Sequence, residues 1–256
     1  MPPTTLFSLA RKTALVSGGG SGLGGFIART LSEAGAQVYL IGRREAVLKT
    51  ALADLEKNGG AGKIFPIDLT AKGAATKLYQ QLADTAEDMP DIIVNAAGIN
   101  PRIPADEISE EDWCHAIHLN LNVPFLLARA FVPPMRRRGW GRIINIASLQ
   151  SYRAFSNGMP YGAAKGGIVQ LTRAMAEAWS PHGINTNAIA PGFFPTDLTA
   201  AVFADKALAA KHAAQTAIGR NGEVSDLRGI TLFFASPASD YITGQTLAVD
   251  GGFTAK

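Results

Sequence analysis

Short apolar runs alternate with longer segments of helical spacing along most of this 256-residue chain. Each run is only a few residues long, is apolar nearly throughout, and ends at Gly, Asn, Asp or Ser. Such runs are typical of strands that are buried on both faces, as in a parallel sheet. They predict seven strands, at residues 13–16, 38–41, 64–67, 92–94, 143–146, 186–189 and 246–249.

The segments between these runs carry apolar residues at helical spacing, most clearly in residues 26–31, 46–55, 109–137 and 163–179. Alternation of strands and helices on this scale indicates βαβ units with right-handed crossovers. We therefore predict one α/β domain over residues 1–256, a doubly wound parallel sheet of the Rossmann type with about seven strands and helices on both faces. Ligands of such folds bind outside the carboxyl ends of the strands, so candidate chemistry is expected directly after each apolar run.

Composition narrows the class of protein without changing this picture. The chain is 47% hydrophobic and 18% charged, which is typical of a packed globular protein rather than a disordered one. The net charge is only +3 and the basic residues are scattered, so no nucleic-acid partner is expected. The tightest basic cluster, residues 136–138 before Gly139, is interpreted as a solvated helix end before a turn.

Cys114 is the only cysteine, which excludes a disulfide within the chain and a thiolate cluster for a metal, and no metal site is predicted. Residues 1–5 lack the charged start and the apolar run of a signal peptide. No apolar stretch reaches the roughly 18 residues needed to span a bilayer. We expect a cytoplasmic protein that does not enter a membrane.

A glycine-rich turn follows the first predicted strand and opens a helix, with the sequence Ser17-Gly18-Gly19-Gly20-Ser21-Gly22-Leu23-Gly24. Glycine lets the backbone turn sharply and approach a phosphate with no Cβ in the way. The start of the following helix offers free N–H groups and the positive end of its dipole. Many such turns are only tight turns, but this placement between strand and helix predicts binding of a dinucleotide pyrophosphate.

The second predicted strand ends at Gly42-Arg43-Arg44. An acidic residue here would hold the ribose 2′-hydroxyl of NAD, whereas an Arg can pair with the 2′-phosphate of NADP. Gly42 takes the acidic position, so Arg43 and Arg44 favour NADP, with NAD as the alternative. Ser21 weakens this preference, because a basic residue in the glycine turn would have strengthened it. The two arginines could instead be ordinary solvated charges at a helix start.

Polar and small residues also follow the third and fourth predicted strands. Asp68 could accept a hydrogen bond from the adenine amino group, or it could cap the next helix. Small residues in Asn95-Ala96-Ala97-Gly98 would let a flat ring or a ribose lie against the strand end. Asn95 could instead bridge neighbouring strands.

Tyr161 and Lys165 lie four residues apart at the start of a predicted helix, and therefore on one helix face. The ordinary pKa of Tyr, near ~10, is too high for efficient proton transfer at neutral pH. A nearby cation stabilises the phenolate, so Lys165 and a positively charged nicotinamide are expected to lower the pKa of Tyr161. This spacing alone is common and more often marks a half-buried Tyr beside a surface Lys.

Two further polar residues are candidates for the same cleft. Ser148 follows the fifth predicted strand, thirteen residues before Tyr161, and its hydroxyl could orient a substrate oxygen or cap a turn. Asn120 interrupts the apolar pattern of residues 109–137. It could hold a water, form a distorted helix turn, or be a satisfied core amide.

Together these residues resemble the short-chain dehydrogenase/reductase family over nearly the whole chain. The residues that match the family's motifs occur in the family's order and at its spacings. They are the glycine turn, Asp68, Asn95 to Gly98, Asn120, Ser148, Tyr161, Lys165, Asn187-Ala188-Ile189-Ala190-Pro191-Gly192 and Thr196. Ser17 stands where Thr is usual, and its hydroxyl can do the same job. Ala96 stands where a second Asn is usual, which removes one hydrogen bond.

The resemblance implies an enzyme that transfers a hydride between NADP, or NAD, and a carbonyl or alcohol substrate, and it implies a homotetramer. Tyr161 would be the acid/base and Ser148 the carbonyl stabiliser. Lys165 would bind the ribose and tune Tyr161, and Asn120 would support a proton relay through water. The implied cofactor contacts are Ser17, Gly18, Ser21, Gly22, Leu23, Gly24, Arg43, Arg44, Asp68, Leu69, Asn95, Ala96, Ala97, Gly98, Tyr161, Lys165, Pro191, Gly192, Phe194 and Thr196.

Within the family, the chain is most similar to gluconate 5-dehydrogenases and related sugar-acid or polyol oxidoreductases, on residues 97–102, 148–151 and 190–196. Arg102 and Arg153 could hold a substrate carboxylate in bidentate fashion, and Gln150 could bond a sugar hydroxyl. Phe193 and Phe194 would make the pocket less polar than an open sugar site. The candidate substrate residues are Arg102, Ser148, Gln150, Arg153, Tyr161 and Phe193.

Two other functions stay open at this point. One is a general ketone or 3-oxoacyl thioester reductase. The other is a cofactor-binding sensor or scaffold without catalysis, against which the complete set of Asn120, Ser148, Tyr161 and Lys165 argues. A lid over residues 194–220 is expected to close over the substrate.

Overall fold

A computed structural model of the chain describes residues 3–85 and 88–256. Met1 and Pro2, which belong to the segment considered for a signal peptide, lie outside the described residues. All seven predicted strands are present, as β1 (Thr13–Ser17), β2 (Gln37–Gly42), β3 (Ala61–Pro66), β4 (Ile92–Asn95), β5 (Gly141–Ile146), β6 (Ile184–Pro191) and β7 (Thr246–Val249).

The strands form one parallel sheet in the order β3-β2-β1-β4-β5-β6-β7. The order reverses direction between β1 and β4, which is the switch point at which ligands bind in doubly wound folds. The prediction of a doubly wound sheet is therefore confirmed. β3 starts at Ala61, earlier than predicted. The sequence does not reveal this start, because the first half of the strand is only partly buried at the sheet edge and carries no apolar run.

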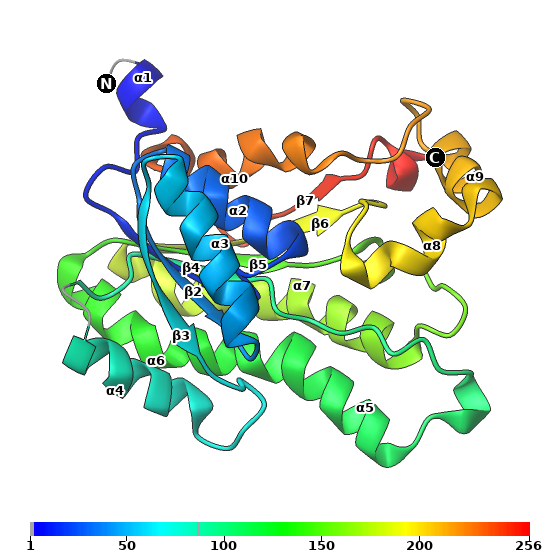
Figure 1. Cartoon of the computed structure of the whole chain (residues 1–256), viewed down its shortest axis with the longest axis horizontal. Helices are drawn as coiled ribbons and strands as arrows, with labels where there is room; N and C mark the ends of the chain where they lie inside the picture. The colour runs from blue at the N-terminus through cyan, green and yellow to red at the C-terminus, as the bar shows by residue number, and fades with distance from the viewer. Residues whose placement is uncertain (1–2, 86–87) are drawn as a thin grey trace.

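Helices cover both faces of the sheet (Figure 1). One face carries α2 (Gly22–Glu33), α3 (Glu45–Lys57) and α10 (Arg228–Ala235), and the other carries α4 (Ala74–Thr85), α5 (Glu110–Ile117), α6 (Val123–Arg138) and α7 (Met159–Trp179). Among the described residues, the two largest apolar clusters pack against the two faces of the sheet. Leu31, Leu40 and Phe234 belong to the first, and Phe131 and Met175 to the second. A smaller buried cluster includes Ile168 and Ala188.

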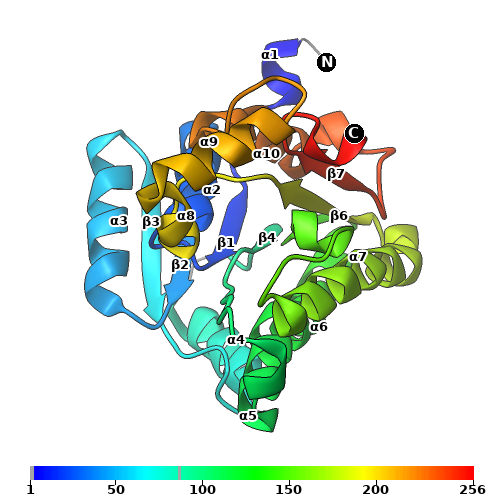
Figure 2. The ribbon, with the colours of Figure 1, turned by 90° about the vertical axis from the view of Figure 1, so that its right-hand side faces the viewer.

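Two short helices, α8 (Ala200–Ala204) and α9 (Lys206–Gln215), project beyond the carboxyl edge of the sheet on the side of α2 and α10 (Figures 1 and 2). They lie within the segment expected to act as a lid. A further short helix, α1 (Pro3–Leu6), precedes β1. In the part of the chain that the structure describes, no helix has the length and apolar character needed to cross a membrane.

The long apolar segment around Asn120 is not one continuous helix. A π-helical turn, His118–Asn122, separates α5 from α6. Asn120 lies in this turn and donates hydrogen bonds to the carbonyls of Ala116 and Ile99, both at 2.9 Å. Of the alternatives for Asn120, the structure thus shows the distorted helix turn. π-Turns of this kind often occur at functional sites.

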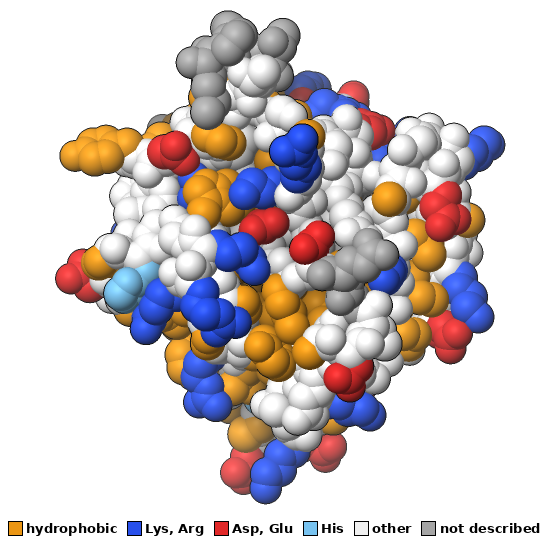
Figure 3. Space-filling view, turned by 90° about the vertical axis from the view of Figure 1, so that its left-hand side faces the viewer, with side chains coloured by type: hydrophobic (Ala, Val, Ile, Leu, Met, Phe, Trp, Pro, Cys, Tyr) orange, Lys and Arg blue, Asp and Glu red, His pale blue; other side chains and the backbone are white. Residues whose placement is uncertain are grey.

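The basic cluster at residues 136–138 forms the last turn of α6, and Gly139 ends the helix with a φ of +65°. Its interpretation as a helix end before a turn is confirmed. Arg138 also donates to the carbonyl of Pro90 at 2.7 Å and pairs with Asp91 at 3.1 Å. On the face at the amino ends of the strands, basic side chains are interspersed with acidic and apolar ones (Figure 3).

Candidate active site

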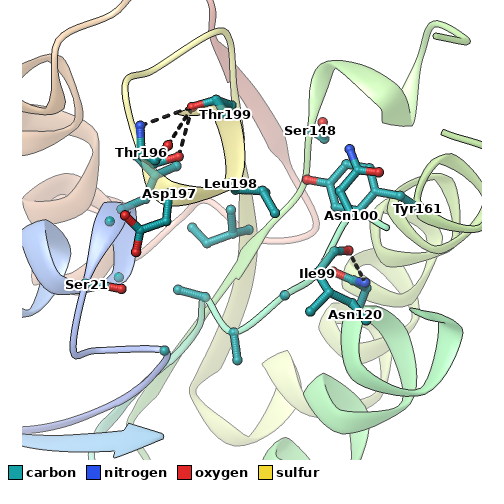
Figure 4. A pocket seen from close by; sticks show the side chains of 18 of the residues that line it. Ser21, Ile99, Asn100, Asn120, Ser148, Tyr161, Thr196, Asp197, Leu198 and Thr199 are labelled. Atoms are coloured by element: carbon teal, nitrogen blue, oxygen red, sulfur yellow. Dashed lines mark hydrogen bonds between the residues drawn. The ribbon is translucent and has the colours of Figure 1, made fainter. Parts of the chain in front are cut away.

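A cavity of about 720 Å³ lies at the carboxyl edge of the sheet, and α8 and α9 contribute to its wall. Figure 4 shows Ser21 and Asp197 on one side of it and Ser148 and Tyr161 on the other. The cavity therefore extends from the glycine turn after β1 to the start of α7. This is the place at which the doubly wound topology predicts a ligand.

The glycine turn packs directly against the end of β4. Gly18 and Gly22 have positive φ angles of +69° and +56°, which favour glycine. A Cβ on Gly18 would lie 2.9 Å from the backbone nitrogen of Ala97, and one on Gly24 would lie 2.3 Å from the carbonyl oxygen of Gly18. The turn thus forms a cradle at the start of α2, where free N–H groups and the helix dipole suit a pyrophosphate.

Most of the predicted cofactor residues line the cavity, but two do not. Ser17 is buried; its hydroxyl donates to the carbonyl of Val94 at 3.3 Å and accepts from Ala96 N–H at 3.1 Å. Asn95 is buried as well and donates to Asn145 Oδ1 at 2.8 Å, which bridges β4 and β5. These two residues hold the strand ends in place rather than forming the cavity wall.

Asp68 lines the cavity together with Arg43, Arg44 and Leu69. Its Oδ1 accepts hydrogen bonds from the backbone N–H of Thr70 at 2.9 Å and from the Thr70 hydroxyl at 2.7 Å. These two bonds, with a smaller contribution from the charge of Arg43, lower the pKa of Asp68. Asp68 does not cap α4, which begins only at Ala74. It closes a local turn and leaves a carboxylate at the adenine end of the predicted cofactor site.

At the other end of the cavity, the predicted catalytic residues lie together. Tyr161 and Lys165 are both buried on α7, and Ser148 lies two residues after the end of β5. Lys165 Nζ lies 5.5 Å from the centre of the Tyr161 ring and donates to the carbonyl of Ile146 at 2.6 Å. Helix geometry and the end of a central strand therefore bring the phenol, the ammonium and the serine hydroxyl to one place.

Burial raises the pKa of Tyr161 above its ordinary value, because an apolar surrounding disfavours the phenolate. A hydrogen bond with Ser148 and the positive charge of Arg102 act in the opposite direction and lower the pKa of Tyr161 in part. In the protein alone, desolvation of the buried phenol outweighs these two contributions. The lowering expected from Lys165 together with a positively charged nicotinamide stays a prediction.

Asn120 Oδ1 is buried and has no hydrogen-bond partner among the described residues. It faces the same space as Lys165, since a Cβ on Gly98 would lie 2.6 Å from Asn120 Oδ1 and 3.9 Å from Lys165 Nζ. A buried acceptor of this kind normally has a partner, and water is a common one. The arrangement fits the implied relay through water.

Five of the six candidate substrate residues line the cavity, and Arg153 does not; the five are Arg102, Ser148, Gln150, Tyr161 and Phe193. Arg153 is exposed, donates to the backbone oxygen of Lys256 at 2.5 Å, and lies 5.5 Å from the centre of the Phe253 ring. The hypothesis that Arg153 holds a substrate carboxylate is therefore not supported. The loop after Ser148 directs this side chain toward the chain end.

Several lining residues belong to no motif that singles them out individually. They are Asn100, Phe155, Asp197, Leu198, Val202, Leu208 and His212. Most of them belong to the lid segment, whose Ala-rich composition is not diagnostic. Only the path of the folded chain brings them to the cavity. Across the described residues, no group of three or more His, Cys, Asp or Glu side chains is placed to hold a metal ion.

Burial of Lys165 has a consequence for stability. It lowers the pKa of Lys165 from 10.5 to about 8, so the unfolded chain binds the proton more tightly than the folded protein. Stability should therefore rise as the pH increases from about 8 to 10.5. We expect the free energy of unfolding, relative to that of Lys165→Met, to increase by about 3 kcal/mol over this interval. Chemical denaturation of both proteins at several pH values measures this, and parallel pH profiles would contradict it.

Comparison with known proteins agrees with this geometry. A family model described as enoyl-(acyl carrier protein) reductase matches residues 18–254. The chain is 38% identical over 251 residues to the gluconate 5-dehydrogenase of Gluconobacter oxydans strain 621H, with 97% of each chain covered. It is 36% identical over 255 residues to the L-tagatose-forming galactitol 2-dehydrogenase of Cereibacter sphaeroides, with 98% of each covered. A crystal structure of a gluconate 5-dehydrogenase from Burkholderia cenocepacia J2315, in complex with NADP and tartrate, has a TM-score of 0.94 at 37% identity, with 99% of each chain covered.

The doubly wound sheet, the glycine cradle and the Ser–Tyr–Lys group define the protein as a nucleotide-binding oxidoreductase. The chain belongs to the short-chain dehydrogenase/reductase family. The family predicted from the sequence is thereby confirmed.

Proposed function

We propose that the protein is an NADP-preferring oxidoreductase that interconverts a secondary alcohol and a ketone on a sugar acid, a sugar or a polyol. The observation that carries this proposal is one continuous cavity with a glycine cradle at one end and Ser148, Tyr161, Lys165 and Asn120 at the other. The relatives named for gluconate and galactitol support the substrate class.

The residues of the cavity fit a dinucleotide phosphate. The cradle and the N-terminus of α2 would hold the pyrophosphate, Asp68 and Leu69 would contact the adenine, and Ala96 to Gly98 would border the ribose and the rings. The nicotinamide end would contact Lys165, Pro191, Gly192, Phe194 and Thr196. When bound, nicotinamide supplies the position that accepts or gives the hydride.

Residues of the chain would transfer the proton and hold the substrate oxygen. In oxidation, Tyr161 would take the proton of the substrate hydroxyl, and in reduction it would return it. Ser148 would hold the same oxygen by a hydrogen bond. Because burial raises the pKa of Tyr161 in the protein alone, positive charge near the phenol must favour the phenolate. Lys165 and the unpartnered Oδ1 of Asn120 would pass the proton onward through water.

The preference for NADP is tested by replacing both arginines that follow β2. We expect Arg43→Ser with Arg44→Ser to lower kcat/KM for NADP by about 10- to 100-fold, because charge-assisted hydrogen bonds to the 2′-phosphate are lost. The kcat/KM for NAD should change little. Arg129→Ser, an exposed arginine that does not line the cavity, is the matched control. An equal loss with both cofactors would argue against this role for the arginines.

At the substrate end, Arg102 is the cation that would bind a carboxylate, and Gln150 would bond a hydroxyl. The similarity to a gluconate 5-dehydrogenase, which is named for a carboxylate substrate, supports this role. A screen of sugar acids, polyols, simple ketones and acetoacetyl thioesters, each with NADP and NAD, tests the substrate class. Turnover of thioesters alone would favour the acyl reductase, and cofactor binding without any turnover would favour the sensor.

Residues 1–256 would act as one catalytic domain in the cytoplasm, and four copies would form the working assembly. Exposed apolar side chains support the assembly: Tyr241 is fully exposed just after the short 3₁₀ turn Pro237–Ser239, and Leu247 is 48% exposed on the edge strand β7. Light scattering coupled to size exclusion tests the assembly. A monomer at micromolar concentration would refute it.

A further inference from the structure

His212 on α9 is a polar lining residue of the cavity that no sequence motif indicates. Its ring stacks on the ring of Phe193, with 3.8 Å between the centroids and an angle of 14° between the planes. Phe193 in turn packs edge-on against Phe155 and Phe253, each at 5.9 Å. The aromatic cluster therefore supports the imidazole in a defined plane at the cavity wall, and one face of Phe193 is covered.

The hydrogen bonds of His212 determine which ring nitrogen can meet a ligand. Its Nδ1 lies 3.2 Å from Gln215 Oε1. With the amide oxygen of Gln215 facing the ring, Nδ1 is the donor and Nε2 keeps a lone pair. Burial lowers the pKa of His212 below its ordinary value of 6.5, and the charges of Lys211 and Arg102 lower it further, against the raising effect of Gln215. At neutral pH the ring is uncharged, and Nε2 is an acceptor.

Arg102 connects this residue with the reaction centre. Its positive charge acts on His212 and also on Tyr161, so the guanidinium lies within electrostatic range of both. A substrate whose reacting carbon lies at Tyr161 and whose carboxylate lies at Arg102 would extend toward the lid. There it meets an acceptor rather than a second cation. Hydroxyl groups of a polyhydroxy chain are the matching donors.

We propose that His212 is a specificity-determining residue of the lid, whose Nε2 accepts a hydrogen bond from a substrate hydroxyl remote from the reacting carbon. This inference deepens the proposed function and rests on it. It selects polyhydroxy substrates over ketones that lack a second hydroxyl, because such a ketone, once bound, would cover the acceptor and leave it unpaired.

His212→Phe tests the proposal, since it keeps the stacking on Phe193 and removes the lone pair. We expect KM for gluconate and for galactitol to rise about tenfold, with a smaller effect on kcat, as one hydrogen bond is lost. His212→Gln, whose Oε1 is an acceptor, should restore most of this loss. The control His182→Phe changes an exposed histidine near the amino end of β6, away from the cavity.

The pH dependence gives a second, independent readout. Protonation of His212 removes the lone pair, so KM for uncharged galactitol should rise as the pH falls through the lowered pKa of His212. In both variants this rise should be absent. A KM that instead falls on acidification, for gluconate only, would show a cation that binds the carboxylate and would overturn the proposal. Unchanged KM values in His212→Phe would also overturn it. Absence of turnover by the unmodified protein on every polyhydroxy substrate would refute the proposed function itself.

Discussion

Tyr161→Phe is expected to lower turnover by about 10³-fold, the range that general acid–base catalysis contributes. The phenyl ring keeps the volume of the buried side chain, and only the hydroxyl that transfers the proton is lost. Affinity for NADP, measured by fluorescence titration, should fall only a few-fold, because the Tyr161 hydroxyl is the one implied cofactor contact that is lost. The melting temperature should change little.

Tyr152→Phe is the matched control for this experiment. Tyr152 is 52% exposed and does not line the cavity, although it lies between Ser148 and Tyr161 in the chain. Its variant should behave as the unmodified protein does. Undiminished turnover in Tyr161→Phe would contradict the proposed mechanism as a whole, since no other described tyrosine lines the cavity.

Gly24→Ala is expected to give the second large effect, this time on the cofactor cradle. The new Cβ would lie 2.3 Å from the carbonyl oxygen of Gly18, so the glycine turn and the start of α2 must separate. Overpacking of this kind costs about 2 to 3 kcal/mol in the free energy of unfolding. NADP affinity should fall with it, because the N–H groups that face the pyrophosphate shift. Thermal unfolding and cofactor titration measure the two effects.

The neighbouring glycine provides the control. A Cβ on Gly25 would lie 3.6 Å from the Gly19 carbonyl oxygen, which is an ordinary van der Waals contact. Gly25→Ala should therefore keep NADP affinity and raise stability by up to about 1 kcal/mol, since Ala favours the helix more than Gly does. Similar losses in the two variants would show that a Cβ at either Gly24 or Gly25 disturbs the cradle. The specific role of Gly24 would then be wrong.

The sheet could be predicted from the sequence because strands buried on both faces need nearly uninterrupted apolar residues. β1, β4 and β5 are fully buried, and each was visible as an apolar run. β3 was located only in part, because an edge strand is half solvated and alternates less clearly. The break in the helix at His118–Asn122 stood only as one of three possibilities for Asn120, since an amide in an apolar pattern has several ways to be satisfied.

For the candidate site, too, the sequence predicts some residues and misses others. Tyr161 and Lys165 could be placed together because positions four apart share a helix face, and Ser148 because the carboxyl ends of parallel strands meet at one edge. The sequence by itself thus determined the fold class, the family and the grouping of the residues proposed for proton transfer. These depend on local periodicity and on the ends of regular elements.

Only the tertiary structure decided what the loops and the lid do. In the folded protein, Arg153 points toward Lys256, and Ser17 and Asn95 are buried and hold the strand ends together. His212 lines the same cavity as Ser148, although more than sixty residues separate the two in the sequence. The tertiary structure also showed that burial raises the pKa of Tyr161 in the protein alone. Side-chain direction in loops and the desolvation of a phenol depend on contacts between segments that are distant in sequence, and no local pattern records those contacts.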